Sequence, residues 1–231
     1  MVALFSVGTV FSQSLYKPVE SVVIQEYFDS LYKFDPRLIS GDYYQPRFSI
    51  PDGHPFFIDE EWKTGSVMLD GTLYDDLLLK YDIISNELVL NTKNMSSFSL
   101  QLVLKKKHIA YFNMGDHFFR PFPGSFQSDS LYFCEVLVQG DTELLLLKSK
   151  TLSVVSDGLT VYRYLLNQAE YLHRNGVLYR YWGRPTLYKL FPEIKADIRR
   201  YLKEKRLKYK RLKLEDSINI VNHCNLLLGE K

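Results

Sequence analysis

The sequence predicts a mainly β or α+β fold, in which an antiparallel β-hairpin meander is capped by a C-terminal helical pair. Short turn signals recur between alternating apolar and polar segments, and Asp70-Gly71 and Asn175-Gly176 are the clearest of them. The chain also has 17 Tyr and 15 Phe, residue types that suit half-buried strands. After Trp182 the apolar spacing becomes helical. These observations leave open whether the strands form an open sheet, a sandwich or a partly closed barrel.

The 231 residues fit a single domain over residues 15–231, with a β-rich part at 56–182 and a helical cap at 186–228. Residues 1–14 are interpreted as the remnant of a secretory signal peptide, cut ahead of Gln13. The basic n-region of such a peptide is missing, so a buried first strand is the alternative. No apolar run approaches the roughly 18 residues that a transmembrane helix needs, so no transmembrane segment is predicted.

Two segments precede the first hairpin. Val19–Phe34 has a loosely helical spacing, which predicts a short helix or an irregular segment. Gly41–Phe57 contains three prolines and two glycines, and this density of helix and strand breakers predicts an ordered loop pinned by aromatic side chains. Long loops on a rigid scaffold often carry function.

Trp62–Thr92 is the stretch around which the sheet is expected to be organised. Asp70-Gly71 supplies its first turn, because a two-residue type I′ loop needs positive φ at both central residues. Ser85-Asn86-Glu87 supplies the second turn. The strand between them has one buried face, formed by Leu77, Leu79, Tyr81 and Ile83.

The later strands follow the same logic. A strand is expected at 98–104, followed by hairpins around Gly115-Asp116 and Gly140-Asp141. The continuous apolar run Leu144–Leu147 predicts a strand covered on both faces. Separate short strands are expected at 152–155, 160–166, 170–173 and 177–182.

Two helices are expected in the cap. The first has helical spacing from Leu187 to Tyr201, with Pro192 in a first turn, and the second covers Glu215–Leu228. Residues 195–213 contain ten Lys and Arg but only two acidic residues, so the rest of the chain is net acidic. A solvated outer face is the preferred interpretation, and no nucleic-acid partner is expected because the chain is interpreted as exported.

The two cysteines, Cys134 and Cys224, lie far apart, one in a strand pattern and one in a helix pattern. They are therefore predicted to be buried free thiols, although export would permit a disulfide. Two isolated cysteines give no support for a metal site.

Several motifs occur together along the chain. They are GDYY at Gly41, GHPFF at Gly53, W-x-x-G at Trp62, DGTLYDDLLLKYDI at Asp70, EVLVQGDTELLLLK at Glu135 and the basic LFPEIKADIRRYLKEKRLKYKR at Leu190. With them the sequence resembles a large set of exported Bacteroidota proteins that have no established function. The resemblance covers most of the chain after residue 20. It implies a signal peptide, one domain and an envelope or secreted location, and it brings no catalytic residues.

The motifs of common enzyme and cofactor sites do not occur: there is no G-x-G-x-x-G, G-x-x-x-x-G-K-[ST], G-x-S-x-G or H-E-x-x-H. No catalytic residue, cofactor or metal ligand is therefore predicted. Asp116-His117 is interpreted as a solvated pair, and Asp59-Glu60-Glu61 as a hydrated carboxylate cluster.

Two groups of aromatic residues are candidates for ligand binding. The first is Tyr179, Arg180, Tyr181 and Trp182, in which Tyr179 and Tyr181 share one side of a strand, as stacking on a carbohydrate would need. The second is Tyr43, Tyr44, His54 and Trp62, which core packing under the proline-rich loop explains equally well.

The leading functional hypothesis is an exported cell-envelope domain that acts as a non-enzymatic structural or interaction module, with an envelope protein or a glycan as partner. It would be located in the periplasm, at the outer-membrane surface or outside the cell. The alternative is a carbohydrate-binding protein that uses an aromatic face. An enzyme with an unrecognised site is the third hypothesis. A pocket at Tyr179 would favour the second, and an exposed sheet edge or apolar patch the first.

Overall fold

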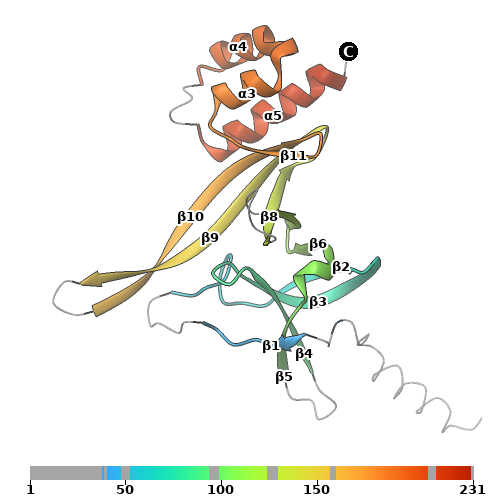
Figure 1. Ribbon diagram of the computed structural model, residues 1–231, viewed down its shortest axis with the longest axis vertical. Coiled ribbons are helices and arrows are strands. Elements are labelled where there is room, and N and C mark those ends of the chain that lie inside the picture. Colours follow the sequence, from blue (N-terminus) through green and yellow to red (C-terminus); the bar gives the residue numbers. More distant parts are fainter. Residues whose placement is uncertain are drawn as a thin grey trace, which may run out of the picture.

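The structure is a computed structural model, which describes residues 38, 41–47, 53–93, 99–123, 130–156, 160–207 and 212–229. In these ranges eleven strands form one antiparallel sheet with the order β1-β5-β4-β3-β2-β6-β7-β8-β9-β10-β11 (Figure 1). Most neighbours in the sheet are also consecutive in the chain, and β1 and β11 lie at opposite edges. The predicted hairpin meander is therefore confirmed, and it is an open sheet.

The strands differ widely in length. The first part of the sheet contains β1 (Asp42–Tyr43), β2 (Lys63–Leu69), β3 (Thr72–Asp82), β4 (Glu87–Lys93) and β5 (Ser99–Val103). A single-turn helix, η1 (Lys106–His108), leads into β6 (Ile109–Met114), β7 (His117–Pro123), β8 (Leu131–Val138), β9 (Thr142–Ser156), β10 (Thr160–Arg174) and β11 (Val177–Arg180). Short turns at the four predicted glycine-containing pairs connect β2 with β3, β6 with β7, β8 with β9 and β10 with β11. In the first of them Asp70 and Gly71 have φ of 48° and 78°, as a type I′ turn requires.

Two details of the strand prediction were wrong. The segment at 152–155 is not a separate strand but the end of β9, and 160–166 and 170–173 belong to the one 15-residue strand β10. The polar pair Asn167-Gln168 interrupts the apolar pattern of β10, but both residues are exposed and paired with β9. Strand pairing therefore continues where burial stops.

The helical cap is built from more pieces than expected. The single helix expected over 187–201 is three elements: α3 (Arg184–Leu190), the single turn η2 (Pro192–Ile194) and α4 (Lys195–Glu204). Pro192 causes the break, because proline lacks the N–H that would continue α3 and fits the first turn of a new helix. The second predicted helix is α5 (Leu214–Gly229), and all these helices gather over the β9–β11 end of the sheet (Figure 1).

The predictions for the N-terminal region fall mainly on residues that the structure does not describe. The signal-peptide remnant at 1–14 and the segment at 19–34 lie outside the described residues. Of the loop expected at 41–57, residues 41–47 and 53–57 are described, and Phe56 forms an isolated bridge with Asp82.

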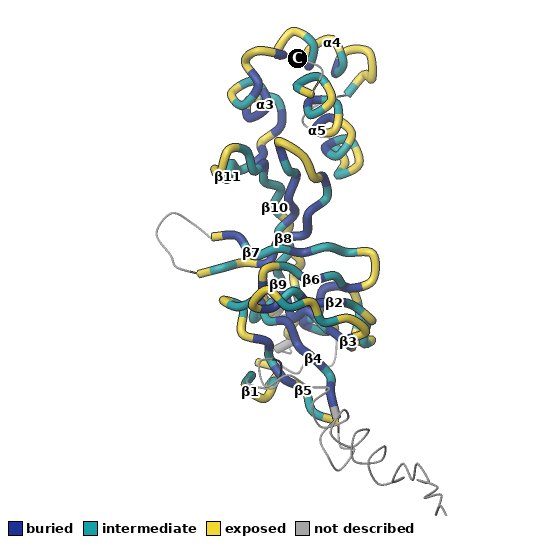
Figure 2. Tube along the Cα trace, turned by 90° about the vertical axis from the view of Figure 1, so that its right-hand side faces the viewer, coloured by how far each residue is buried: buried dark blue, intermediate teal, exposed yellow. Residues whose placement is uncertain are grey.

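Aromatic side chains form the centre of the larger core. Figure 2 shows the buried stretches of the strands in this part of the sheet in dark blue. Phe112 stacks on Phe119 with ring centroids 4.6 Å apart, and Phe133 meets Phe112 edge-on at 5.0 Å. The Tyr81 hydroxyl donates to Asn86 Oδ1 at 2.9 Å, and Asn86 Nδ2 donates to Leu131 O at 2.7 Å. This buried asparagine joins the β3–β4 turn to β8 and satisfies the polar end of the tyrosine.

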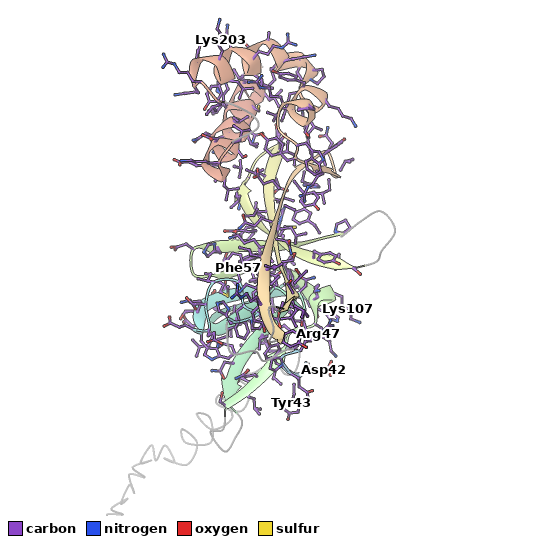
Figure 3. The ribbon with its side chains drawn as sticks, turned by 90° about the vertical axis from the view of Figure 1, so that its left-hand side faces the viewer. Asp42, Tyr43, Arg47, Phe57, Lys107 and Lys203 are labelled. Atoms are coloured by element: carbon purple, nitrogen blue, oxygen red, sulfur yellow. The ribbon has the colours of Figure 1, made fainter. Side chains whose placement is uncertain are left out.

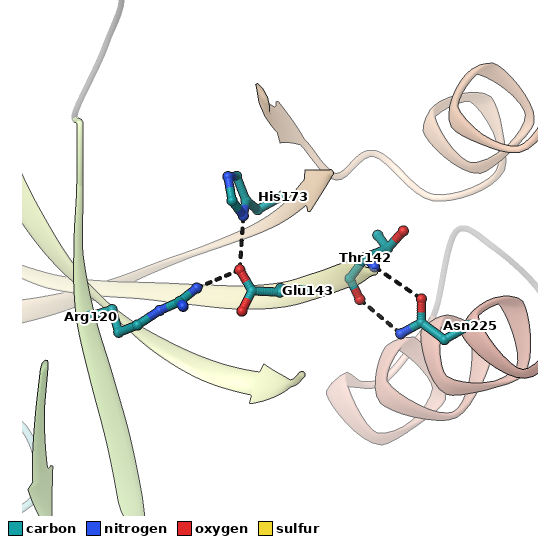
Figure 4. Close-up of polar contacts among 5 residues, drawn as sticks. All are labelled: Arg120, Thr142, Glu143, His173 and Asn225. Atoms are coloured by element: carbon teal, nitrogen blue, oxygen red, sulfur yellow. Dashed lines mark hydrogen bonds and ion pairs between the residues drawn. The ribbon is translucent and has the colours of Figure 1, made fainter. Parts of the chain in front are cut away.

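A second core lies between the helices and β8–β11, with Leu144, Leu172, Leu187 and Val221 fully buried. Asn225 of α5 fastens this cap to β9: Thr142 N–H donates to Asn225 Oδ1 at 3.1 Å, and Asn225 Nδ2 donates to Thr142 O at 2.8 Å (Figure 4). Cys134 and Cys224 are free and buried, as predicted.

Candidate functional site

The four residues of the first aromatic group, 179–182, lie in three different environments: the helical core, a groove beside the cap and an exposed surface. Tyr181 belongs to the helical core with only 8% of its surface exposed, and burial raises the pKa of its hydroxyl. Its ring is therefore covered by protein and is not presented to a ligand. Tyr179 is half-buried on the same side of the strand, beside the cap.

Arg180 and Trp182 lie on the opposite side of the strand from Tyr179. The Arg180 guanidinium lies 5.0 Å from the ring centroids of both Tyr171 and Trp182. Trp182 is 69% exposed, and its backbone N–H donates to Thr186 Oγ1 at 3.0 Å. An arginine held between two rings and an exposed indole form an aromatic surface, but the cation already occupies one face of the indole.

Tyr179 lines a groove of about 290 Å³ between the β10–β11 turn and the end of α3. Arg174 is fixed in this groove: its guanidinium donates to Leu190 O and to Glu193 Oε1, the latter at 3.2 Å, and lies 4.7 Å from the Phe191 ring centroid. The exposed Lys189 has its Nζ 5.9 Å from the Tyr179 ring centroid. An oriented arginine, a second cation and an aromatic wall can together hold a small anionic or polar ligand.

The second aromatic group anchors the N-terminal segment to the sheet. The Tyr44 hydroxyl donates to Asp82 Oδ2 at 2.8 Å, and burial next to this carboxylate raises the tyrosine pKa. Asp82 is fully buried and also accepts from the backbone N–H groups of Ile84 and Ser85. Lys150 Nζ donates to His54 O at 2.7 Å, and burial lowers the pKa of both the His54 and Lys150 side chains.

The remaining members of that group lie apart from it. Trp62 contacts Lys80, whose Nζ lies 4.5 Å from the indole centroid and 4.8 Å from the Phe56 ring centroid. Tyr43 is 68% exposed on the short edge strand, away from the basic cap that carries Lys203 (Figure 3). The geometry of this group fits the packing interpretation, because its polar atoms are used to hold the segment in place.

Two polar networks that the sequence did not reveal cross the sheet. Glu143 on β9 accepts from Arg120 on β7 and lies 2.8 Å from His173 Nδ1 on β10 (Figure 4). On the other face of the sheet, Glu135 lies 2.5 Å from His117 Nδ1 and 3.4 Å from Lys148 Nζ. His117 therefore pairs with a buried carboxylate across the sheet. It is not half of a solvated pair with Asp116, and that interpretation was wrong.

These networks join strands rather than form a site open to a ligand. Each carboxylate is almost covered, with 13% of the Glu143 side chain and 9% of the Glu135 side chain exposed, and each interacts with two cationic or titratable partners. Their members are far apart in sequence, and only the strand register brings them together. Among the described residues no group of three or more His, Cys, Asp or Glu is arranged to hold a metal ion.

The far half of the β9–β10 hairpin is the other candidate surface. β8 pairs with β9 only up to Leu146, and β11 pairs with β10 only at 171–174. Beyond these points β9 and β10 pair only with each other, as a two-stranded ribbon of residues 147–156 and 160–169. The ribbon projects from the rest of the sheet (Figure 1). Among the ribbon side chains that the structure describes, the large exposed apolar ones are Val154, Tyr162, Leu165 and Leu166, which are 58%, 44%, 51% and 52% exposed.

Sequence reasoning missed this ribbon because the alternation of apolar and polar residues along a strand does not reveal where its pairing with a neighbouring strand ends. The one available signal was the pair of adjacent leucines, Leu165-Leu166, in a segment with polar residues on both sides. On a strand, adjacent apolar residues point to opposite faces, so one of them must be exposed unless both faces are covered.

No helix in the described ranges is long and apolar enough to cross a membrane. No protein-family model, curated protein or solved structure matches the chain. The resemblance to exported Bacteroidota proteins therefore stays a prediction.

Proposed function

We propose that the chain is an exported cell-envelope domain that acts as an interaction module and has no catalytic role. The observation that carries this proposal is the β9–β10 ribbon, which presents four large apolar side chains outside both hydrophobic cores. Val154 pairs with Tyr162 and shares one face of the ribbon with Leu166, while Leu165 lies on the other face. An isolated two-stranded ribbon is marginally stable in water, and exposed apolar patches are typical of interaction sites. The body anchors this ribbon near its base through Lys150, whose backbone N–H donates to Ile83 O at 3.3 Å.

The exported location rests on the leader-like residues 1–14 and on the resemblance to exported proteins. It is tested by fractionating cells that express the full gene and by determining the first residue of the protein. A start near Gln13 in the envelope or the medium is expected. An intact Met1 in the cytoplasm would contradict export and would make the basic helix α4 the first surface to study.

The interaction role is tested by photo-cross-linking in living cells. A photoreactive amino acid replaces Tyr162 on the ribbon or, as a matched control, the exposed Tyr43 on β1. A discrete cross-linked product is expected from position 162 and not from position 43. Equal labelling from both positions would show that the ribbon is not a preferred contact surface.

The second candidate function is binding of a carbohydrate, and the groove beside Tyr179 favours it. A tyrosine ring can stack on the C–H face of a sugar, while Arg174 and Lys189 favour a sugar that carries a carboxylate. Calorimetric titration with glucuronic acid and with glucose tests this function. We expect the acidic sugar to bind more tightly, and Tyr179→Ala to abolish binding while Tyr132→Ala, on another exposed tyrosine, leaves it unchanged.

A further inference from the structure

We infer that two copies of this chain pair through the outer edges of their β10 strands, so that two ribbons form one continuous four-stranded antiparallel sheet. This inference rests on the proposed interaction role of the ribbon and names its partner, a second copy. The observations that carry it are the direction of the backbone groups along β10, the composition of that edge and the register that a two-fold axis allows.

Strand geometry determines which peptide groups of β10 face outward. Tyr181 N–H donates to Glu170 O at 2.9 Å, so the polar backbone groups of Glu170 point away from β9. Backbone direction alternates along a strand, and β9 and β10 pair without a bulge from Thr160 to Arg174. The N–H and C=O groups of Tyr162, Leu166 and Gln168 therefore also point away from β9. The outward N–H of Lys150 on β9, which reaches Ile83, agrees with the same alternation.

No strand in the described ranges pairs with this side of β10 at residues 160–169. At a strand rise of about 3.3 Å per residue these ten residues span about 33 Å. The opposite edge of the sheet differs from it, because β1 has only two residues and Pro46 follows soon after. Residues 160–169 contain no proline and no lysine, and Arg163 is their only charged residue. Apart from Arg163, this stretch thus lacks the prolines and charges that usually prevent strand addition at an edge.

A two-fold axis through Leu165 gives a self-complementary register. It places Tyr162 opposite Gln168 of the second copy, and both have outward backbone groups, so they form a hydrogen-bonded pair. It places Leu165 opposite Leu165, which joins two exposed apolar side chains on one face. Arg163 lies opposite Asn167, so no like charges face each other. The Leu165 pair on the axis is thus apolar, and the one charged residue near it, Arg163, faces a neutral amide.

The position of the ribbon also suits a second copy. The strongly basic cap lies at the opposite end of the β9–β10 hairpin from the projecting ribbon (Figure 1). Pairing at the ribbons keeps the two caps apart, and over such distances salt screens their repulsion.

Cysteine substitution tests this register directly. Leu165→Cys would place two thiols at a pair that is not hydrogen-bonded, where Cα atoms are about 4.5 Å apart, within the range of a disulfide. Mild oxidation removes two electrons and two protons from the thiols and transfers them to an added oxidant such as oxidised glutathione. We expect a covalent dimer from Leu165→Cys and none from Val154→Cys, because Val154 is no less exposed than Leu165 but lies on β9. The native thiols are buried and give little background.

Sedimentation of the purified full chain over a range of concentrations provides the second measurement. The wild type is expected to be a concentration-dependent dimer. Leu165→Lys, which brings two ammonium groups together at the axis, is expected to weaken dimerisation by at least about tenfold, whereas Val154→Lys leaves it unchanged. A wild type that stays monomeric at its highest soluble concentration would overturn the inference. A monomer that still gives the cross-linked product at position 162 in cells overturns only the second copy as partner, whereas loss of both results overturns the interaction role as well.

Discussion

The two halves of the β9–β10 hairpin share strands, register and handedness, yet they have opposite environments. Near the cap, Leu144 and Leu172 have no exposed surface, because helices cover this face. In the ribbon, Leu166 lies on the same face of β10 as Leu172 and is 52% exposed. Backbone pairing is thus continuous across a boundary at which burial ends. The difference teaches that one strand of this protein combines two environments: its near half is packed in the fold, and its far half is exposed.

The largest expected effect compares two leucines on the same face of β10. Leu172→Ala is expected to lower the free energy of unfolding by about 2–5 kcal/mol, because it leaves a cavity between the sheet and the cap. Leu166→Ala is expected to change it by no more than about 0.5 kcal/mol, because solvent already reaches the side chain. Urea denaturation of both variants, at a concentration where the chain is monomeric, provides the measurement. Similar losses for the two variants would show that the ribbon is packed in solution.

An intermediate effect compares two asparagines. Asn225→Ala removes both hydrogen bonds to the Thr142 backbone and is expected to cost about 1–2 kcal/mol. Asn167→Ala removes only contacts to Thr151 Oγ1 and Leu165 O, at 3.2 and 3.4 Å on an exposed strand, and is expected to be nearly neutral. Thermal unfolding of the two variants measures the difference. An equal shift in melting temperature would mean that the two hydrogen bonds of Asn225 stabilise the protein no more than the exposed contacts of Asn167.

These comparisons also show what the sequence could predict. The turns at Asp70-Gly71 and Asn175-Gly176 were predictable because positive φ restricts the residue types that fit there. The burial of Tyr81 was predictable from the period of β3. The end of α3 at Leu190 was missed because apolar spacing continues across Pro192, although the proline breaks the helix.

The candidate sites were less predictable, because they depend on how far neighbouring strands reach. Tyr179 and Tyr181 do share one side of their strand, but the position of α5 buries Tyr181 and leaves Tyr179 beside a groove. The pairing of His117 with Glu135 requires the register of β7 on β8, which no local pattern contains. The ribbon exists because β9 separates from β8 after Leu146 and because β11 has only four residues, and no local pattern in β9 or β10 indicates either.

The smallest expected effect compares buried and exposed thiols. Burial raises the pKa of Cys134 and of Cys224 to about 12. An unfolded thiol ionises near pH 8.5, so between pH 7 and 9 the unfolded state loses protons that the folded state keeps, and stability falls as pH rises. The loss is expected to be about 1 kcal/mol for each thiol at pH 9.

The measurement is the difference in unfolding free energy between pH 7 and pH 9 for the wild type and for Cys134→Ala. The variant is expected to lose less stability than the wild type over this interval. Val154→Cys in the ribbon provides the matched comparison, because an exposed thiol has a similar pKa in both states and adds no pH dependence. In the folded protein this added thiol is also expected to react rapidly with iodoacetamide, while Cys134 and Cys224 stay unlabelled. Rapid labelling of the native cysteines would show that the strands and helices around them open easily, and that the contrast between the covered and projecting halves of β9 and β10 is weaker than their burial indicates.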